Sequence, residues 1–134
     1  MNKLSGIIKQ IQKSGAIVLV DFDVEGQTFS ALTIESTQSD TWLQEGNHID
    51  AVFKEPEVSL AHNLTGLISM RNRMKCKVTM IETGVLLTKI TLLFFNNEIH
   101  SIITTRALKQ IQIKIGDEIE ALIKSNEIAL MKKK

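Results

Sequence analysis

The stretch His48–Lys54, HIDAVFK, returns about 70 residues later as Glu118–Lys124, EIEALIK. A glycine lies two residues before each copy. Just downstream, Glu57–Leu60 is matched by Glu127–Leu130. Segments that agree in order, spacing and apolar pattern indicate an internal repeat, and the repeat decides how many modules the chain contains.

The agreement extends upstream, so the repeat covers most of the chain. Ser30–Thr33 matches Ser101–Thr104, with insertions of one or two residues between the matched blocks. Insertions at such points are typical of loops. The 134 residues alone would suggest one domain. The repeat instead predicts two homologous β-barrel modules, the first over residues 1–62 and the second over residues 63–134.

Each module has the pattern of a small β-structure. Ala16–Phe22 and Val85–Leu93 are apolar and β-branched, and Gln27–Leu32 alternates polar with apolar residues. Helical turns are predicted at Ser39–Gln44 and Arg106–Ile111. The predicted fold is therefore all-β, with two tandem OB-like Greek-key β-barrel modules, each with a short helical turn.

Charge, hydropathy and cysteine content narrow the class of protein. The formal net charge is +1, so no global field attracts the chain to nucleic acid or to an anionic membrane. Residues 1–20 contain no signal peptide, and no apolar run approaches the ~18 residues of a membrane span. Cys76 is the single cysteine, which excludes a disulfide within the chain. We expect a cytoplasmic protein.

Three blocks resemble the motifs of one family. Ser69–Cys76, SMRNRMKC, follows the family's opening pattern Ser-Ala-Arg-Asn-x-Leu-x-Gly. Leu32–Ser36 matches its Ile-Thr-x-x-Ser block. Gly116–Ser125, GDEIEALIKS, is close to its closing block, Gly-Asp-x-Val-x-Ala-x-Ile-Lys followed by Ala or Ser. In this order and spacing the chain resembles the Mop, or TOBE, family of molybdenum-pterin-binding and molbindin-like proteins, and within it the tandem di-Mop proteins.

The two copies depart from the family pattern in different ways. The first copy lacks the family's Ser and Arg before Asn2, and it has Glu55 where the family has a small residue after the lysine. The second copy has Ala107 where the first has Ser36, and Cys76 replaces the opening glycine. We therefore expect the two copies to form unequal sites.

The resemblance implies that the chain binds molybdate or tungstate. Either anion is a tetrahedral dianion, so a protein holds it with hydroxyl groups, backbone N–H groups and a few positive charges. The resemblance implies no organic cofactor and no side chain that coordinates the metal directly. The candidate oxyanion-binding residues are Ser69, Met70, Arg71, Lys124, Ser125, Thr104, Thr33, Ser36 and Lys54.

Several of these candidates have an equally good structural interpretation. Thr33 and Thr104 suit strand ends, where a hydroxyl satisfies backbone groups, and Ser36 suits a helix N-cap. The carboxylate of Glu55, next to Lys54, would repel a dianion in the same pocket.

The predicted function is binding of the oxyanion in the cytosol for storage, buffering or homeostasis. The resemblance implies sites between modules of different subunits of a homo-oligomer, with a trimer favoured over a dimer. The alternative is an effector-sensing module of a molybdate-responsive transcription regulator that lacks its DNA-binding part. No catalytic triad, phosphate loop or acid pair points to an enzyme. With no tyrosine and one tryptophan, the chain lacks the stacking residues of a nucleic-acid binder, and we expect neither nucleic acid nor membrane as partner.

Overall fold

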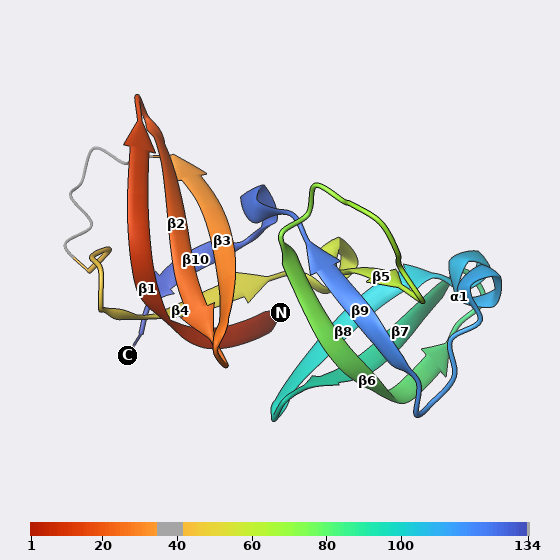
Figure 1. Ribbon diagram of the computed structural model, residues 1–134. Helices are drawn as coiled ribbons and strands as arrows, with labels where there is room; N and C mark the ends of the chain where they lie inside the picture. Colours follow the sequence, from red (N-terminus) through yellow and green to blue (C-terminus); the bar gives the residue numbers. More distant parts are fainter. Residues whose placement is uncertain (35–41, 134) are drawn as a thin grey trace.

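Two curled antiparallel sheets lie side by side in this computed structural model, which describes residues 1–34 and 42–133 (Figure 1). The strand order is β10-β4-β1-β2-β3 in the first sheet and β5-β9-β6-β7-β8 in the second. Helical structure in the described residues is limited to three short segments. The elements are β1 (Asn2–Ser14), β2 (Ile17–Val24), β3 (Gln27–Ile34), β4 (His48–Phe53), η1 (Glu55–Glu57), β5 (Ser59–Ala61), β6 (Asn72–Thr83), β7 (Leu87–Phe94), β8 (Asn97–Thr104), α1 (Thr105–Ile111), β9 (Glu118–Ile123), η2 (Ser125–Glu127) and β10 (Ala129–Lys132).

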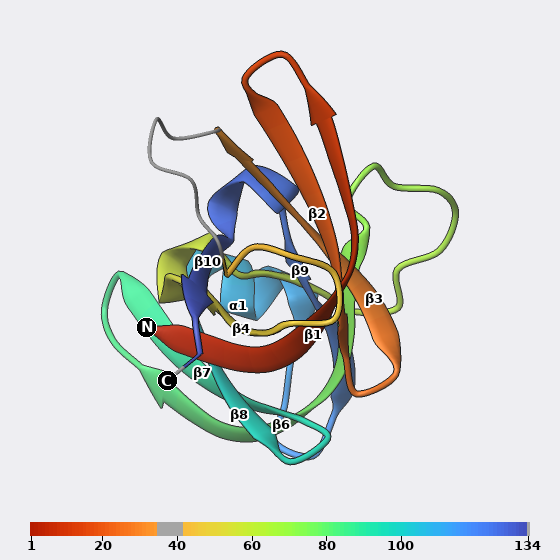
Figure 2. The same ribbon diagram turned by 90° about the vertical axis from the view of Figure 1, so that its left-hand side faces the viewer.

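The long strands β1 and β6 bend, and each bend curls its sheet (Figure 2). Every second residue at the start of β1 is buried, which is the alternation of a strand with one face on the core. The first part of β1 pairs with β4 and the later part with β2, and the register shifts between Ile8 and Gln10. β6 has an equivalent shift between Val78 and Met80. An irregularity of this kind bends a strand and increases its twist, which closes a sheet toward a barrel.

The hairpin registers show how the two copies correspond. Ile17 pairs with Ile34 in the first module, and Leu87 pairs with Thr104 in the second. The hairpins are therefore related by an offset of 70 residues, and Thr104 takes the position of Ile34. The sequence match of Ser30–Thr33 to Ser101–Thr104 is shifted by one residue, because similar side chains on adjacent positions aligned better than the true equivalents.

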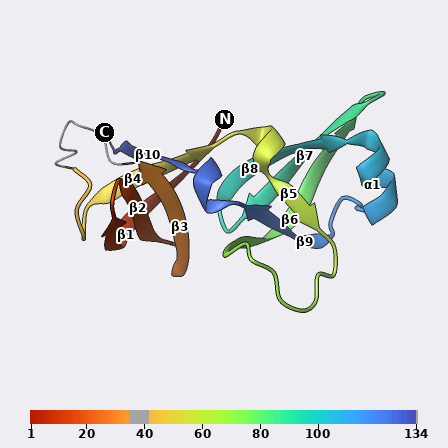
Figure 3. The same ribbon diagram turned by 90° about the horizontal axis from the view of Figure 1, so that it is seen from above.

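Each sheet is completed by a strand from the other half of the chain. β10, at the C-terminal end, pairs with β4 of the first sheet, and β5 pairs with β9 of the second sheet (Figure 3). The sheets therefore exchange their last strands across the predicted boundary between residues 62 and 63. That boundary stays a prediction about the sequence copies, while the sheets themselves mix residues from both sides of it.

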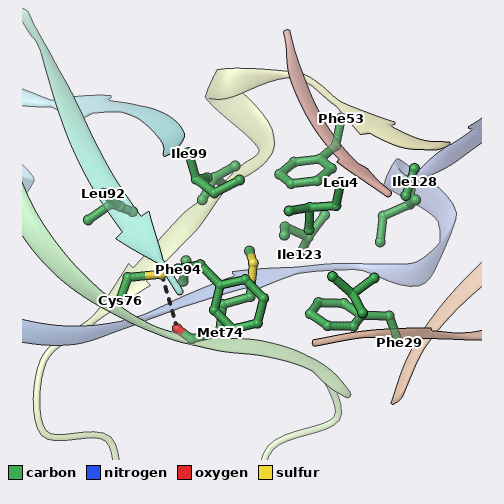
Figure 4. Packing of buried hydrophobic residues seen from close by; sticks show 14 of the residues in the cluster. Leu4, Phe29, Phe53, Met74, Cys76, Leu92, Phe94, Ile99, Ile123 and Ile128 are labelled. Atoms are coloured by element: carbon green, nitrogen blue, oxygen red, sulfur yellow. Dashed lines mark hydrogen bonds between the residues drawn. The ribbon is translucent and has the colours of Figure 1, made fainter. Parts of the chain in front are cut away.

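The apolar core runs without a break through both modules. The rings of Phe22 and Phe29 lie 5.8 Å apart, and Phe29 meets Phe94 edge to face at 6.0 Å. Because Phe29 belongs to β3 and Phe94 to β7, this contact joins the two sheets (Figure 4). The buried residues of both halves accordingly form one cluster.

Two buried asparagines at equivalent positions hold the modules together. The side chain of Asn72 accepts a hydrogen bond from Ser30 N at 2.7 Å and donates to Ser30 O at 2.9 Å. Asn2 binds the backbone of His100 in the same two-sided way, with both distances 2.8 Å. An asparagine of each module therefore hydrogen-bonds to an edge strand of the other: Asn72 binds β3 and Asn2 binds β8. The relation is a pseudo-twofold one.

One of the two predicted helical turns is confirmed. The turn predicted at Arg106–Ile111 is α1, whose first turn is capped by the side chain of Thr104, which accepts a hydrogen bond from Ala107 N at 3.1 Å. Of the turn predicted at Ser39–Gln44, residues 39–41 lie outside the described residues, and residues 42–44 form no helix. No helix in the described part of the chain has the length and apolar character to cross a membrane.

Replacing Asn72 with Ala is expected to destabilise the fold. The variant leaves Ser30 N–H, Ser30 C=O and Ile123 C=O without a partner in a buried position, a loss of about 2–4 kcal/mol in the free energy of unfolding. Equilibrium urea unfolding measures the change. Asn2→Ala is the matched comparison and should cost less, because Asn2 makes two such bonds. An Asn72→Ala protein as stable as the wild type would show that the hydrogen bonds of Asn72 to Ser30 and Ile123 do not stabilise the fold.

Cys76 is a packed core residue with no reactive character. Burial raises the pKa of its thiol to about 12, and the S–H group lies 3.5 Å from Met74 O (Figure 4). Because the thiolate is the nucleophile, iodoacetamide at about pH 8 should leave the folded protein unlabelled and modify it fully after unfolding in urea. Mass spectrometry reads the result, and rapid labelling of the folded chain would show that the thiol is accessible.

Candidate functional site

The end of the β6–β9 strand pair places two cationic side chains next to each other. Asn72 and Ile123 are register partners, and Asn72 Nδ2 donates to Ile123 O at 3.0 Å. Arg71 directly precedes this pair and Lys124 directly follows it, so both side chains leave the sheet at the same end. Both residues are exposed.

These two cations are available to a ligand. Within residues 1–34 and 42–133, neither the guanidinium of Arg71 nor the ammonium of Lys124 forms a hydrogen bond or an ion pair with another side chain. Arg73, two residues further on, is different: its Nε and Nη2 donate to the carboxylate of Glu120 at 2.7 and 2.9 Å. The same pairing holds the pKa of the Glu120 carboxyl below its ordinary value. Arg71, and not Arg73, is therefore the free guanidinium.

Ser125 adds a hydroxyl to the two cations. It is the first residue of the η2 turn, and Lys124 is its N-cap with φ −67° and ψ 146°. Glu127 N donates to Lys124 O at 3.0 Å and closes the turn. The side chain of Lys124 makes no capping bond, so its ammonium is not needed by the turn. Arg71, Lys124 and Ser125 together supply only hydrogen-bond donors and a hydroxyl, which is the inventory that an oxyanion requires.

The first half builds the same turn with different chemistry. Lys54 is the N-cap of η1 with φ −83° and ψ 148°, and Glu57 N donates to Lys54 O at 3.1 Å. Glu55 stands where the second half has Ser125. The Met1 ammonium donates to Glu55 Oε2 at 2.7 Å, and this hydrogen bond holds the pKa of the carboxyl below its ordinary value. Glu55 is therefore a charged acceptor at neutral pH.

A cavity of about 260 Å³ connects the two turns. Equivalent carboxyl groups of the two turns, those of Glu57 and Glu127, both line it, because residues near a pseudo-twofold axis lie close to their own counterparts. Burial, and then the charge of Glu57, raise the pKa of Glu127, against the opposing charge of Lys124. The lining residues are Met1, Val52, Phe53, Lys54, Glu57, Asn126, Glu127, Ile128 and Ala129.

The remaining predicted residues lie in several places. Ser69 and Met70 belong to the loop that leads into Arg71, the first exposed and the second half-buried. Thr33 pairs with Val18 on the edge strand β3. Thr104 lies at the start of α1, at the far end of the second module from the η2 turn (Figure 1), and its hydroxyl oxygen caps that helix. Ser36 lies outside the described residues.

Within one chain, then, the structure gathers Arg71, Lys124 and Ser125, with Ser69 two residues and Met70 one residue before Arg71. It places Lys54 on the equivalent turn, Thr33 on β3, which packs against η2, and Thr104 at the start of α1. The assignment of the nine residues to an oxyanion site stays a prediction.

Sequence reasoning overlooked three residues that shape this region. Asn72 lies inside the opening motif, but its role appears only once its partners on β3 and β9 are known. Glu57 and Glu127 were used to align the copies, yet nothing in the sequence indicates that equivalent turns meet. The repeat itself was the available signal, since a pseudo-twofold relation brings equivalent positions near its axis together.

The described residues contain no group of three or more His, Cys, Asp or Glu side chains arranged to hold a metal ion. Their buried side-chain nitrogen and oxygen atoms all have hydrogen-bond partners. Unused polar groups therefore lie at the surface, where Arg71 and Lys124 are the clearest neighbouring pair of donors.

Known proteins match both the sequence and the fold. The TOBE domain family matches residues 68–130. Molybdenum-pterin-binding proteins 1 and 2 of Clostridium pasteurianum are 34% and 32% identical over 65 residues, which span 48% of this chain and 96% of each relative. The chain belongs to the molybdenum-pterin-binding, or Mop, family. The resemblance inferred from Ser69–Cys76 and Gly116–Ser125 is confirmed.

A solved structure extends the match to both modules. The cytoplasmic molybdate-binding protein ModG, in a crystal form with molybdate bound, superposes with a TM-score of 0.91 and 26% sequence identity. The match covers 98% of this chain and 96% of ModG. The predicted all-β, OB-like fold of two Mop modules is therefore confirmed.

The Glu57–Glu127 contact predicts a pH dependence of stability. Because the pKa of Glu127 is raised in the folded state, the stability present below its ordinary pKa is lost as the pH rises through the folded pKa. Glu127→Gln removes this loss. Its free energy of unfolding, relative to the wild type, should therefore increase between about pH 4 and about pH 7.

Urea unfolding at a series of pH values measures the difference. Glu57→Gln should reproduce part of the effect, because it removes the charge that opposes Glu127 and leaves the burial of Glu127 unchanged. Glu45→Gln, at an exposed site, is the control and should give a flat difference. A flat profile for Glu127→Gln as well would show that the two carboxyl groups do not interact.

Proposed function

We propose that this protein binds molybdate or tungstate as the intact oxyanion and serves to store or buffer it in the cytoplasm. The observation that carries the proposal is the unpaired couple Arg71 and Lys124 beside the hydroxyl of Ser125. The likeness to ModG, a cytoplasmic molybdate-binding protein, over 98% of this chain supports both the ligand and the compartment.

The chemistry of the three side chains fits the ligand. Molybdate carries two negative charges and four acceptor oxygens, and Arg71 and Lys124 carry two positive charges. A guanidinium can donate to two oxygens at once, an ammonium donates at the end of a flexible stem, and the Ser125 hydroxyl donates to a further oxygen. Charge-assisted hydrogen bonds contribute about 1.5–3 kcal/mol each, so a few of them give useful affinity.

Three side chains on one exposed end of a sheet leave the other side of the anion uncovered. We therefore propose that a second copy of the chain completes the site, in a homo-oligomer with a trimer favoured over a dimer. Thr33 belongs to β3, which packs against the η2 turn, and Thr104 caps α1; we propose that both add hydroxyl groups to the donor set, in the same copy or in a neighbouring one. Ser69 and Met70 remain members of the proposed donor set of the second half, and Ser36 and Lys54 are the corresponding candidates of the first half.

A binding role fits the chain better than catalysis. The single thiol, Cys76, is buried with a raised pKa, which removes it as a nucleophile. We propose that Arg71, Lys124 and Ser125 act as hydrogen-bond donors to the anion. We propose no organic cofactor and no partner in nucleic acid or membrane.

The test is calorimetric titration of the full chain with molybdate, with tungstate as a second ligand and sulfate and phosphate as controls. Lys124→Ala and Arg71→Ala should each weaken molybdate binding about 10- to 100-fold, because each removes charge-assisted hydrogen bonds. Arg73→Ala is the matched control: it removes an arginine two residues away that is already paired with Glu120, and should leave the affinity unchanged.

Circular dichroism and mass in solution confirm that each variant keeps its fold and assembly. Undiminished binding by the Arg71→Ala, Lys124→Ala double variant would remove these residues from the site. No binding of molybdate by the wild-type chain would overturn the proposed function itself.

A further inference from the structure

We propose that Glu55 closes the first half's copy of the oxyanion site, so that the exchange of a hydroxyl for a carboxylate at this one position decides which half of the chain binds. The inference rests on the proposed function at Lys124 and Ser125. It adds the identity of the residue that makes the two halves unequal and the direction of its effect.

The two turns follow nearly the same backbone path, and they differ in their side chains and at Pro56, which has no backbone N–H where Asn126 has one. Lys54 and Lys124 both have extended backbone, both act as N-caps without a side-chain capping bond, and both precede a three-residue turn. The closing hydrogen bonds, Glu57 N to Lys54 O and Glu127 N to Lys124 O, measure 3.1 and 3.0 Å. The lysine is thus presented in the same way twice, so its own backbone geometry gives no reason for one half to bind and the other not to.

The side chain after the lysine reverses the local chemistry. Ser125 offers a hydroxyl that can donate to an oxyanion, whereas an ionised Glu55 can only accept. The carboxylate also carries the charge of the ligand, adjacent in sequence to the lysine that would attract it. A glutamate carboxyl is already ionised at neutral pH, and the hydrogen bond from the Met1 ammonium lowers the pKa of Glu55 further.

The contact with Glu55 also pairs the positive charge of the Met1 ammonium. The Met1 ammonium bonds Glu55 Oε2 at 2.7 Å instead of standing free. In the second half, the equivalent position is Arg71, whose guanidinium has no such partner among the described residues. The first half therefore pairs its positive charge internally, while the second half leaves its positive charge unpaired beside a hydroxyl.

Molybdate calorimetry on the full-length chain tests the inference, with the number of anions bound per chain as the main readout. Glu55→Ser gives the first half the residue of the second, and should add molybdate bound per chain relative to the wild type. Ser125→Glu gives the second half the residue of the first, and should weaken binding at the existing site at least about tenfold.

Glu55→Gln separates charge from size. It keeps a side chain of the same length and removes the carboxylate, so it should add binding if charge closes the site. Circular dichroism and mass in solution verify the fold and assembly of each variant, and sulfate at equal concentration checks that any added binding is not general anion attraction.

The outcomes separate this inference from the function on which it rests. Wild-type binding with an unchanged number of anions per chain in Glu55→Ser overturns the inference alone. Wild-type binding with undiminished affinity in Ser125→Glu overturns it as well, since the hydroxyl would then be dispensable. A wild-type chain that binds no molybdate overturns the proposed function, and the inference with it.

Discussion

The exchange of strands and side chains between the two halves is the constraint on which the rest of this molecule depends. β10 leaves the second half to pair with β4, β5 pairs with β9, and a buried asparagine of each half grips an edge strand of the other. Neither sheet is complete with residues of one half, so the two barrels form together. The position of the candidate site follows directly, because Asn72 binds Ile123 O and the backbone of Ser30 at once. It thereby fixes where Arg71 and Lys124 leave the sheet.

This exchange also determines what the two copies do to each other. A pseudo-twofold relation brings equivalent residues together near its axis, so any charge placed there meets the same charge. Glu57 and Glu127 show the result, because burial and the neighbouring charge raise the pKa of Glu127. An anion site near such an axis faces the same problem, since two adjacent sites would place two dianions close together. If Glu55 closes the site of the first half as proposed, a chain with Ser125 in one turn and Glu55 in the other avoids that repulsion.

The sequence was informative wherever local pattern decides structure. Apolar β-branched runs and period-2 alternation predicted β2, β3 and β7, the repeat predicted two modules, and the helix predicted at Arg106–Ile111 begins one residue earlier, at Thr105. The sequence could not predict the pairing of strands that depends on which half of the chain a segment contacts. β4 has the same local pattern as β9, and β5 as β10, so nothing in the residues says whether a last strand pairs within its own half or with the other. The site was predictable only in part for the same reason. Motifs identify Arg71 and Lys124, but their proximity depends on the β6–β9 register. Thr33 and Thr104 were treated as equivalent because the sequence alignment of the two copies was shifted by one residue.

The covalent link between the modules has a consequence that assembly from single modules cannot reproduce. The curated relatives correspond to about half of this chain, 48% of it for 96% of their own length. If identical single modules pair about a twofold axis, every position on one side must carry the same residue as its counterpart. In a tandem chain the two sides are encoded separately, so each is free to change while the shared geometry is kept. Lys54 and Lys124 show what the geometry retains, and Glu55 and Ser125 show what it leaves free. Because the backbone of the two turns follows nearly the same path, a difference in ligand binding between them has to come from the residues that differ, which are Glu55 against Ser125 and Pro56 against Asn126.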